Sequence, residues 1–191
     1  MKSACVVDAS VIIRLGGERV FHVIPQLFSC AMVPQEAFDE IINDQELKKQ
    51  IETYRQTAKA KIVGRIMLDQ FQRASYDSVI SSMRPYLSSE QSEYSNIGET
   101  SSVAMAIALS VPIVLMDDSE AEGVIEQIPG IRNGINIFRS IAAIRAAKAL
   151  GIISRKTERA LEKRWASQGD SPTQSEDGKL LVEALKKAGA T

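Results

Sequence analysis

Two short apolar segments that each end in aspartate constrain the fold of this chain most strongly. Residues 4–7 lead directly to Asp8, and residues 111–116 lead to Asp117 and Asp118. Short apolar runs of this kind are typical of strands that are buried on both faces of a parallel sheet. Because ligands bind beyond the carboxyl ends of such strands, we expect the three aspartates to meet in one crevice.

Stretches with helical spacing separate these strands. Helices are expected over residues 20–28, 35–42, 44–58, 76–83, 99–109, 120–127, 135–150, 154–166 and 179–188. A short strand is expected at 30–33, and Pro34 suits the first turn of the helix that follows. Residues 62–68 fit either a strand or a buried helical turn, and 88–96 fit a loop or a frayed helix end.

This alternation indicates an α/β fold, with helices flanking a short parallel β-sheet. The chain shows no internal repeat and no low-complexity linker, so we expect a single domain over residues 1–191. Within it, residues 43–96 form a long middle region and residues 135–191 form C-terminal helices.

The amino-acid composition limits the kinds of functional site that this chain can form. The only cysteines, Cys5 and Cys30, argue against a disulfide framework and favour a cytoplasmic protein. No window approaches the roughly 18 uninterrupted apolar residues that suggest a membrane span, and the first residues do not resemble a signal peptide. A single histidine, His22, argues against a histidine-rich zinc site and a Ser-His-Asp triad. We therefore expect the functional site to use carboxylate side chains.

The charge is nearly balanced but unevenly distributed. The net charge is −1, from 23 basic and 24 acidic residues. Between Arg139 and Arg164, however, basic side chains are concentrated, with Glu158 and Glu162 as the acids among them. This segment is either a solvated helical face or a surface that contacts phosphates.

Two glutamates extend the acidic set. Glu40 lies on the helix after the second strand, and Glu99 lies in the first turn of a buried helix. Carboxylates that converge in one crevice repel each other unless a cation lies between them, and all-oxygen ligation favours Mg²⁺ or Mn²⁺. Singly, each acid has a simpler explanation. Asp8 or Asp118 can cap a helix, Glu99 can favour a helix N-terminus, and Glu40 can be solvent-facing.

Four sequence blocks resemble the motifs of PIN domains. They are VVDASVIIRL (6–15), VPQEAFDEII (33–42), IGETSSVAMAIAL (97–109) and VPIVLMDDSEAEGVIE (111–126). They are most similar to a prokaryotic subgroup related to VapC-type toxins of toxin–antitoxin pairs. The tail AIRAAKALGIISRKTERALEKR (143–164) also resembles that subgroup.

The resemblance implies a PIN-like fold and a metal-dependent ribonuclease. Its catalytic residues would be Asp8, Glu40, Glu99 and Asp117. Asp8, Glu99, Asp117 and Asp118 would be the metal ligands, with Asp118 as an alternative or additional member beside Asp117. Ser10 would support the first aspartate by hydrogen bonding.

The resemblance also implies partners: RNA as substrate and an inhibitory antitoxin protein, with a homo-oligomer left open. Arg14 and the basic 139–164 segment are candidates for holding the phosphate backbone. Two features depart from the subgroup: Glu120 and Glu122 stand where a basic residue is common, and the middle region is longer. The alternatives are a non-catalytic PIN-like scaffold that binds RNA or protein and, less favoured because no Gly-rich loop is visible, a small-molecule phosphohydrolase. We expect no site acid from residues 61–96, so Asp69 and Asp77 should lie elsewhere.

Overall fold

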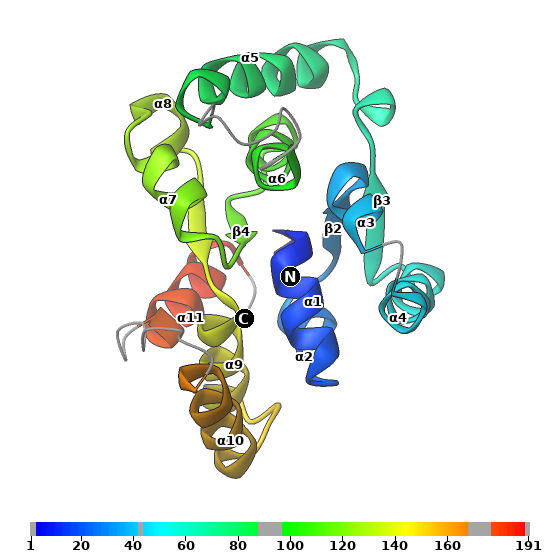
Figure 1. Ribbon diagram of the computed structural model, residues 1–191, viewed down its shortest axis with the longest axis vertical. Coiled ribbons are helices and arrows are strands. Elements are labelled where there is room, and N and C mark those ends of the chain that lie inside the picture. Colours follow the sequence, from blue (N-terminus) through cyan, green and yellow to red (C-terminus); the bar gives the residue numbers. More distant parts are fainter. Residues whose placement is uncertain (1–2, 42–43, 88–96, 168–176, 190–191) are drawn as a thin grey trace.

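A five-stranded parallel sheet organises the chain. The computed structural model describes residues 3–41, 44–87, 97–167 and 177–189 (Figure 1). The strands are β1 (Cys5–Val7), β2 (Ala31–Pro34), β3 (Ala60–Val63), β4 (Ile113–Leu115) and β5 (Asn136–Phe138). They lie in the order β3-β2-β1-β4-β5, and each neighbouring pair is parallel. The expected α/β fold with a parallel sheet is therefore confirmed.

Helices connect the strands and cover the sheet. Those before β4 are α1 (Ala9–Gly17), α2 (Val23–Leu27), α3 (Gln35–Glu40), α4 (Gln45–Gln56), the 3₁₀ turn η1 (Arg65–Met67), α5 (Gln70–Leu87) and α6 (Ile97–Ala108). Those after it are α7 (Ser119–Glu126), α8 (Pro129–Arg132), α9 (Ser140–Ala149), α10 (Arg155–Ala166) and α11 (Asp177–Lys187). None of the described helices is long and apolar enough to cross a membrane.

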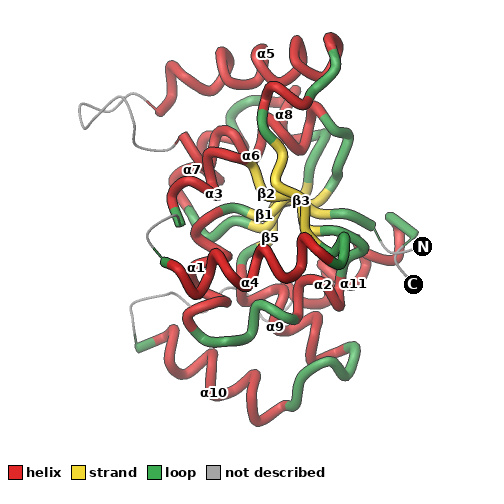
Figure 2. Tube along the Cα trace, turned by 90° about the vertical axis from the view of Figure 1, so that its right-hand side faces the viewer, coloured by secondary structure: helices red, strands yellow, loops and turns green. Residues whose placement is uncertain are grey.

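Two hydrophobic cores lie on opposite faces of the sheet. In β1, Cys5 and Val7 belong to one core and Val6 belongs to the other. The first core includes residues of α1, α2, α9 and α11, whereas the second includes residues of α5, α6 and α7. Figure 2 shows these two sets of helices above and below the strands. Both faces of the central strands are therefore buried, which explains their continuous apolar sequences.

The order of the strands reverses direction between β1 and β4. The chain runs outward from β1 through β2 to β3, and it adds β4 and β5 on the other side of β1. Such a reversal separates the connections that leave the two neighbouring strands, and ligands bind in the crevice at their carboxyl ends. Asp8 follows β1, and Asp117 and Asp118 follow β4. The topology thus brings the three aspartates to the same place.

Several segments differ from the sequence-based expectations. Residues 136–138 form strand β5 and not the beginning of a helix, which starts only at Ser140. Pro34 is the last residue of β2, with φ −56° and ψ 146°, and the helix begins after it. Pro85 lies inside α5 instead of ending it. Residues 62–68 divide between the end of β3 and η1, and residues 88–96 lie outside the described residues.

Candidate active site

Asp8 lies where β1 ends and α1 begins. Only 1% of the residue is exposed. Its Oδ2 accepts hydrogen bonds from the backbone N–H of Ser10 at 3.0 Å and from the Ser10 hydroxyl at 2.6 Å. Its Oδ1 accepts a hydrogen bond from the Ser102 hydroxyl at 3.0 Å. These donors satisfy a buried carboxylate and fix its orientation. Asp8 is therefore a helix cap whose carboxylate is also rigidly held.

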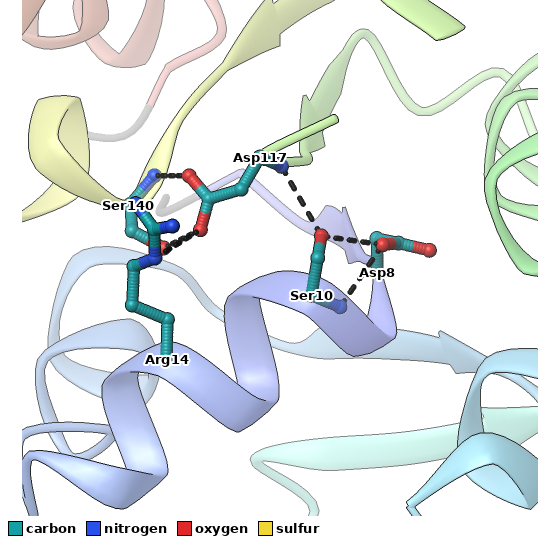
Figure 3. A network of polar contacts seen from close by, with 5 residues as sticks. All are labelled: Asp8, Ser10, Arg14, Asp117 and Ser140. Carbon is teal, nitrogen blue, oxygen red and sulfur yellow. Dashed lines mark hydrogen bonds and ion pairs between the residues drawn. The ribbon is translucent and has the colours of Figure 1, made fainter. Parts of the chain in front are cut away.

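Ser10 links the ends of the two central strands. Its hydroxyl donates to Asp8 Oδ2 and accepts a hydrogen bond from the backbone N–H of Asp117 at 3.2 Å. The backbone N–H of Asp8 also donates to the carbonyl of Leu115 at 3.0 Å. The aspartates that follow β1 and β4 are therefore joined through one serine side chain (Figure 3).

The Asp117 carboxylate points towards Ser140 and Arg14, away from Asp8 (Figure 3). Its Oδ1 accepts a hydrogen bond from the backbone N–H of Ser140 at 2.8 Å, and its Oδ2 accepts one from the Ser140 hydroxyl at 2.5 Å. The Nε atom of Arg14 lies 3.3 Å from the same Oδ2. With 6% of its side chain exposed, Asp117 holds the first turn of α9 and the Arg14 guanidinium together.

Glu40, the last residue of α3, lies against the first turn of α6. The backbone N–H of Gly98 donates a hydrogen bond to its carboxylate. A Cβ added at residue 98 would overlap Glu40 Oε1 and lie 2.9 Å from Cδ. Although the residue as a whole is exposed, desolvation of its carboxylate, together with the charges of Asp8 and Glu99, raises the pKa of Glu40 to about 7 from 4.5.

The carboxylate of Glu99 interacts electrostatically with those of Asp8, Glu40 and Asp118. Desolvation raises the pKa of Glu99, and the charges of Asp8 and Asp118 raise it further, against a hydrogen bond from its own backbone N–H. Four carboxylates are therefore electrostatically coupled: those of Asp8, Glu40, Glu99 and Asp118. Of the two aspartates after β4, Asp118 is the one whose charge raises the pKa of Glu99, whereas the Asp117 carboxylate bonds Ser140 of α9.

The neighbouring acids of α3 have other partners. Glu36 Oε1 accepts a hydrogen bond from the Tyr76 hydroxyl at 3.4 Å, and Asp39 Oδ1 accepts one from the Gln35 amide at 2.8 Å. Neither Glu36 nor Asp39 is among the charges that raise the pKa of Glu99. Of the acids on this helix, Glu40 is the one that couples to Asp8 and Glu99.

The acidic side chains of the middle region also pair with nearby residues of that region. Asp77 forms an ion pair with Arg65 at 2.5 Å, and Asp69 Oδ1 accepts a hydrogen bond from the backbone N–H of Gln72 at 2.9 Å. Neither aspartate contributes to the charges that raise the pKa of Glu40. That residues 61–96 supply no site acid stays a prediction.

The donor set suits a hard divalent cation. Within the described ranges, no three Asp, Glu, His or Cys side chains are close enough to hold one metal ion in common. The four coupled carboxylates nevertheless offer oxygen ligands alone, which Mg²⁺ and Mn²⁺ prefer. Their mutual repulsion is what a cation between them would relieve.

Two serines of this site are not picked out by the sequence pattern. Ser102 lies three residues after Glu99 and therefore on the same side of α6, which is a usable signal. Ser140 follows β5, and its position at a helix start stays hidden when 135–150 is treated as one helix. Both donate a hydroxyl hydrogen bond to an aspartate at a strand end.

Comparison with known proteins identifies the family. The family model DUF3368, described as a PIN domain, matches residues 4–167. This chain belongs to the PIN-domain family. PIN domains are generally nucleases, bind nucleic acids and typically use divalent metal ions. No curated protein and no solved structure matched the chain.

The PIN-domain match covers all four acidic blocks. Asp8, Glu40, Glu99 and the Asp117–Asp118 pair lie inside the matched residues, whereas α11 lies beyond them. The match identifies the PIN-domain family but does not distinguish the toxin-related subgroup within it.

Proposed function

We propose that this PIN-domain protein is a Mg²⁺- or Mn²⁺-dependent endoribonuclease that hydrolyses RNA phosphodiester bonds. The observation that carries the proposal is the electrostatic coupling of Asp8, Glu40, Glu99 and Asp118. Desolvation, together with the charges of Asp8 and Glu99, raises the pKa of Glu40 to about 7. Coupled carboxylates near a topological switch point, two of them with raised pKa values, favour a functional cation site over four separate structural roles.

The residues have distinct roles in this mechanism. Asp8, Glu99 and Asp118 would be direct ligands of one or two metal ions, and Glu40 would position the nucleophilic water. A divalent cation, when bound, activates water and neutralises charge that develops on the scissile phosphate. Ser10 and Ser102 keep the Asp8 carboxylate in one orientation, so no reorganisation of this ligand is needed during the reaction.

Asp117 has a different role in the proposal, although a direct metal contact is the alternative. Both of its oxygens accept hydrogen bonds from Ser140. We assign it to positioning: it holds α9 and Arg14 beside the acid group. Arg14 is in turn a candidate for contacting the phosphate backbone, since the planar guanidinium group of arginine can bond two phosphate oxygens at once.

The test is RNA cleavage by the wild type and by three variants. The purified protein should degrade a mixed RNA substrate in Mg²⁺ or Mn²⁺, and EDTA should stop the reaction. Asp118→Asn and the double variant Asp117→Asn/Asp118→Asn should both lose activity by about two orders of magnitude or more, because ligand loss weakens metal binding and transition-state stabilisation. Asp117→Asn alone should lose less.

Controls separate a true activity from contamination. A contaminating nuclease is unaffected by the substitutions, so equal cleavage by the wild type and the double variant would refute the proposal. Absence of cleavage in both metals, with RNA still bound, would favour the rival function, a non-catalytic PIN-like scaffold. The near-neutral net charge of −1 is the observation that favours this rival.

We also propose a cytoplasmic setting and an inhibitory antitoxin protein as partner. Both cysteines are free, and the sequence resembles toxins of toxin–antitoxin pairs. A neighbouring gene for a small DNA-binding protein would support this partner. Co-expression should then suppress the cleavage activity, and a partner that binds without inhibiting would contradict the toxin assignment.

A further inference from the structure

The exposed side of α10 carries a cluster of basic side chains. Four exposed side chains form this face, and we call them the α10 basic face: Arg155, Lys156, Arg159 and Lys163. At about 100° of rotation per residue, these positions lie within roughly one third of the helix circumference. The opposite side of the helix is buried through Leu161 and Trp165, of which 5% and 3% are exposed.

Helix stability does not account for this pattern. Arg155 and Lys156 occupy the first turn of α10, where the helix dipole disfavours positive charge. The acids of α10 lie to one side of the basic face, and Glu162 forms an ion pair with Arg145 of α9 at 2.8 Å. The helix therefore does not need the positive charges of the α10 basic face. No acidic side chain of α10 lies within that face to neutralise them.

The C-terminal end of α10 adjoins the candidate active site. The guanidinium carbon of Arg14 lies 5.5 Å from the centre of the Trp165 ring, and Arg14 also pairs with Asp117. Arg164 forms an ion pair with Glu18, which ends α1. In both views α10 lies at one end of the molecule (Figures 1 and 2).

We propose that the α10 basic face binds the sugar–phosphate backbone of RNA that extends beyond the cleavage site. The inference rests on the proposed nuclease function and adds a second contact region to it. From residue 155 to residue 163 the helix rises by about 12 Å, enough for several backbone contacts along one strand. A basic face on a helix whose C-terminal end packs against Arg14 through Trp165 matches a polyanion and no apolar partner.

Binding at several salt concentrations tests the proposal. RNA affinity is measured in EDTA, where cleavage cannot occur, for the wild type and for Arg155→Gln/Lys156→Gln/Arg159→Gln/Lys163→Gln. Each phosphate contact to a single strand contributes about 0.7 to the slope of log affinity against log salt. We therefore expect the slope of the variant to fall by about two to three. Its unfolding midpoint should not change, because all four side chains are exposed.

A matched variant removes the same charge elsewhere. Lys49, Arg55, Lys59 and Lys61 are also exposed and lie on or after α4. Changing these four residues to Gln should leave the slope as in the wild type. Equal losses in both variants would overturn the inference, since net charge alone would then explain binding.

Cleavage assays separate this inference from the proposed function. The α10 variant should cleave long RNA at least tenfold more slowly than the wild type but cleave an oligonucleotide too short to reach α10 at an equal rate. A cleaving wild type whose RNA binding does not depend on α10 would overturn the inference and leave the nuclease intact. RNA binding that depends on α10, with no cleavage by the wild type, would support the surface and refute the nuclease.

Discussion

At the residue scale, the position of the Glu40 carboxylate depends on the absence of a side chain at Gly98. We predict that Gly98→Ala displaces this carboxylate, because the new Cβ would overlap Oε1. The affinity for Mn²⁺ should fall about tenfold or more, the scale of losses when the shell around a metal site is disturbed. Calorimetric titration with Mn²⁺ measures this, and the fold should survive because alanine is the better helix former.

Gly123→Ala is the matched control for this change. Gly123 also lies in a helix, α7, and in the described structure no heavy atom lies within 4 Å of a Cβ built there. This variant should bind Mn²⁺ as the wild type does. Unchanged Mn²⁺ binding in Gly98→Ala would show that Glu40 does not contribute to the site.

Glu40 should also make the stability of the metal-free protein depend on pH. Its pKa is about 7 in the folded protein, against an ordinary value of 4.5. Between these values the folded state retains a proton that the unfolded state has released, so the free energy of unfolding falls as pH rises. In EDTA, the unfolding midpoint should therefore decrease from about pH 5 to about pH 8.

Glu40→Gln is the variant that checks this assignment. Glutamine does not ionise, so the decrease with pH should become shallower. It should not vanish, because the pKa of Glu99 is also raised. A pH dependence identical to that of the wild type would mean that Glu40 is not the titrating group.

The acidic residues themselves could be predicted from sequence, but their orientations could not. Asp8, Glu40 and Glu99 stand out because each follows a strand or lies on a helix that starts near the same sheet end. Asp117 and Asp118 are adjacent and chemically identical, so no local pattern separates them. The two orientations differ because Ser140, which is 23 residues after Asp117 in the chain, donates hydrogen bonds to the Asp117 carboxylate.

At the element scale, the same limit applies to the short strands. β1 and β4 are predicted because each is an apolar run that ends in aspartate. β5 has three residues, too few to show a two-residue period, and an apolar helix follows two residues later, so it merges with that helix. The helices expected over 44–58 and 154–166 begin where predicted, because Asp44 and Ser154 cap α4 and α10 and accept bonds from backbone N–H groups within the next three residues.

The packing of α11 on α9 gives a prediction at this scale. A Cβ added at Gly178 would overlap the Cβ of Arg145 and lie 3.2 Å from its backbone carbon. We expect Gly178→Ala to destabilise the protein by about 1–3 kcal/mol, the usual range for overpacking. Urea unfolding measures this. Gly130→Ala, with open space around the added Cβ in the described structure, should have a smaller effect, and equal effects would argue against close packing of α11.

At the scale of the whole molecule, the candidate site ties distant parts of the chain together. Asp8 follows β1, Glu99 lies on α6 and Asp118 follows β4, and the sheet order brings them to the carboxyl ends of the two central strands. The two hydrophobic cores hold the helices on either face but contribute nothing to neutralising these acids. Metal binding should therefore raise the free energy of unfolding of the whole fold. That residues 1–191 form one domain stays a prediction.

Mn²⁺ should stabilise the folded protein, and Asp8 should be required. A ligand that binds only the folded state at about 100 times its dissociation constant adds about 2.7 kcal/mol to the free energy of unfolding. For a chain of this length, that corresponds to a rise of roughly 5–10 °C in the unfolding midpoint. EDTA should reverse the rise. Asp8→Asn keeps a side chain that can cap α1 but loses the charge, so its midpoint should not respond to Mn²⁺.

The comparison is made within each protein, since Asp8→Asn changes the starting stability through its lost hydrogen-bond acceptor strength. Asp39→Asn is the matched control, because Asp39 is an exposed acid on α3 that accepts a hydrogen bond from Gln35 and lies outside the coupled group. It should respond to Mn²⁺ as the wild type does. An equal rise in all three proteins would place Mn²⁺ elsewhere on the molecule. A rise that is lost only in Asp8→Asn would tie the cation to the end of β1, where the strand order makes ligand binding geometrically favoured.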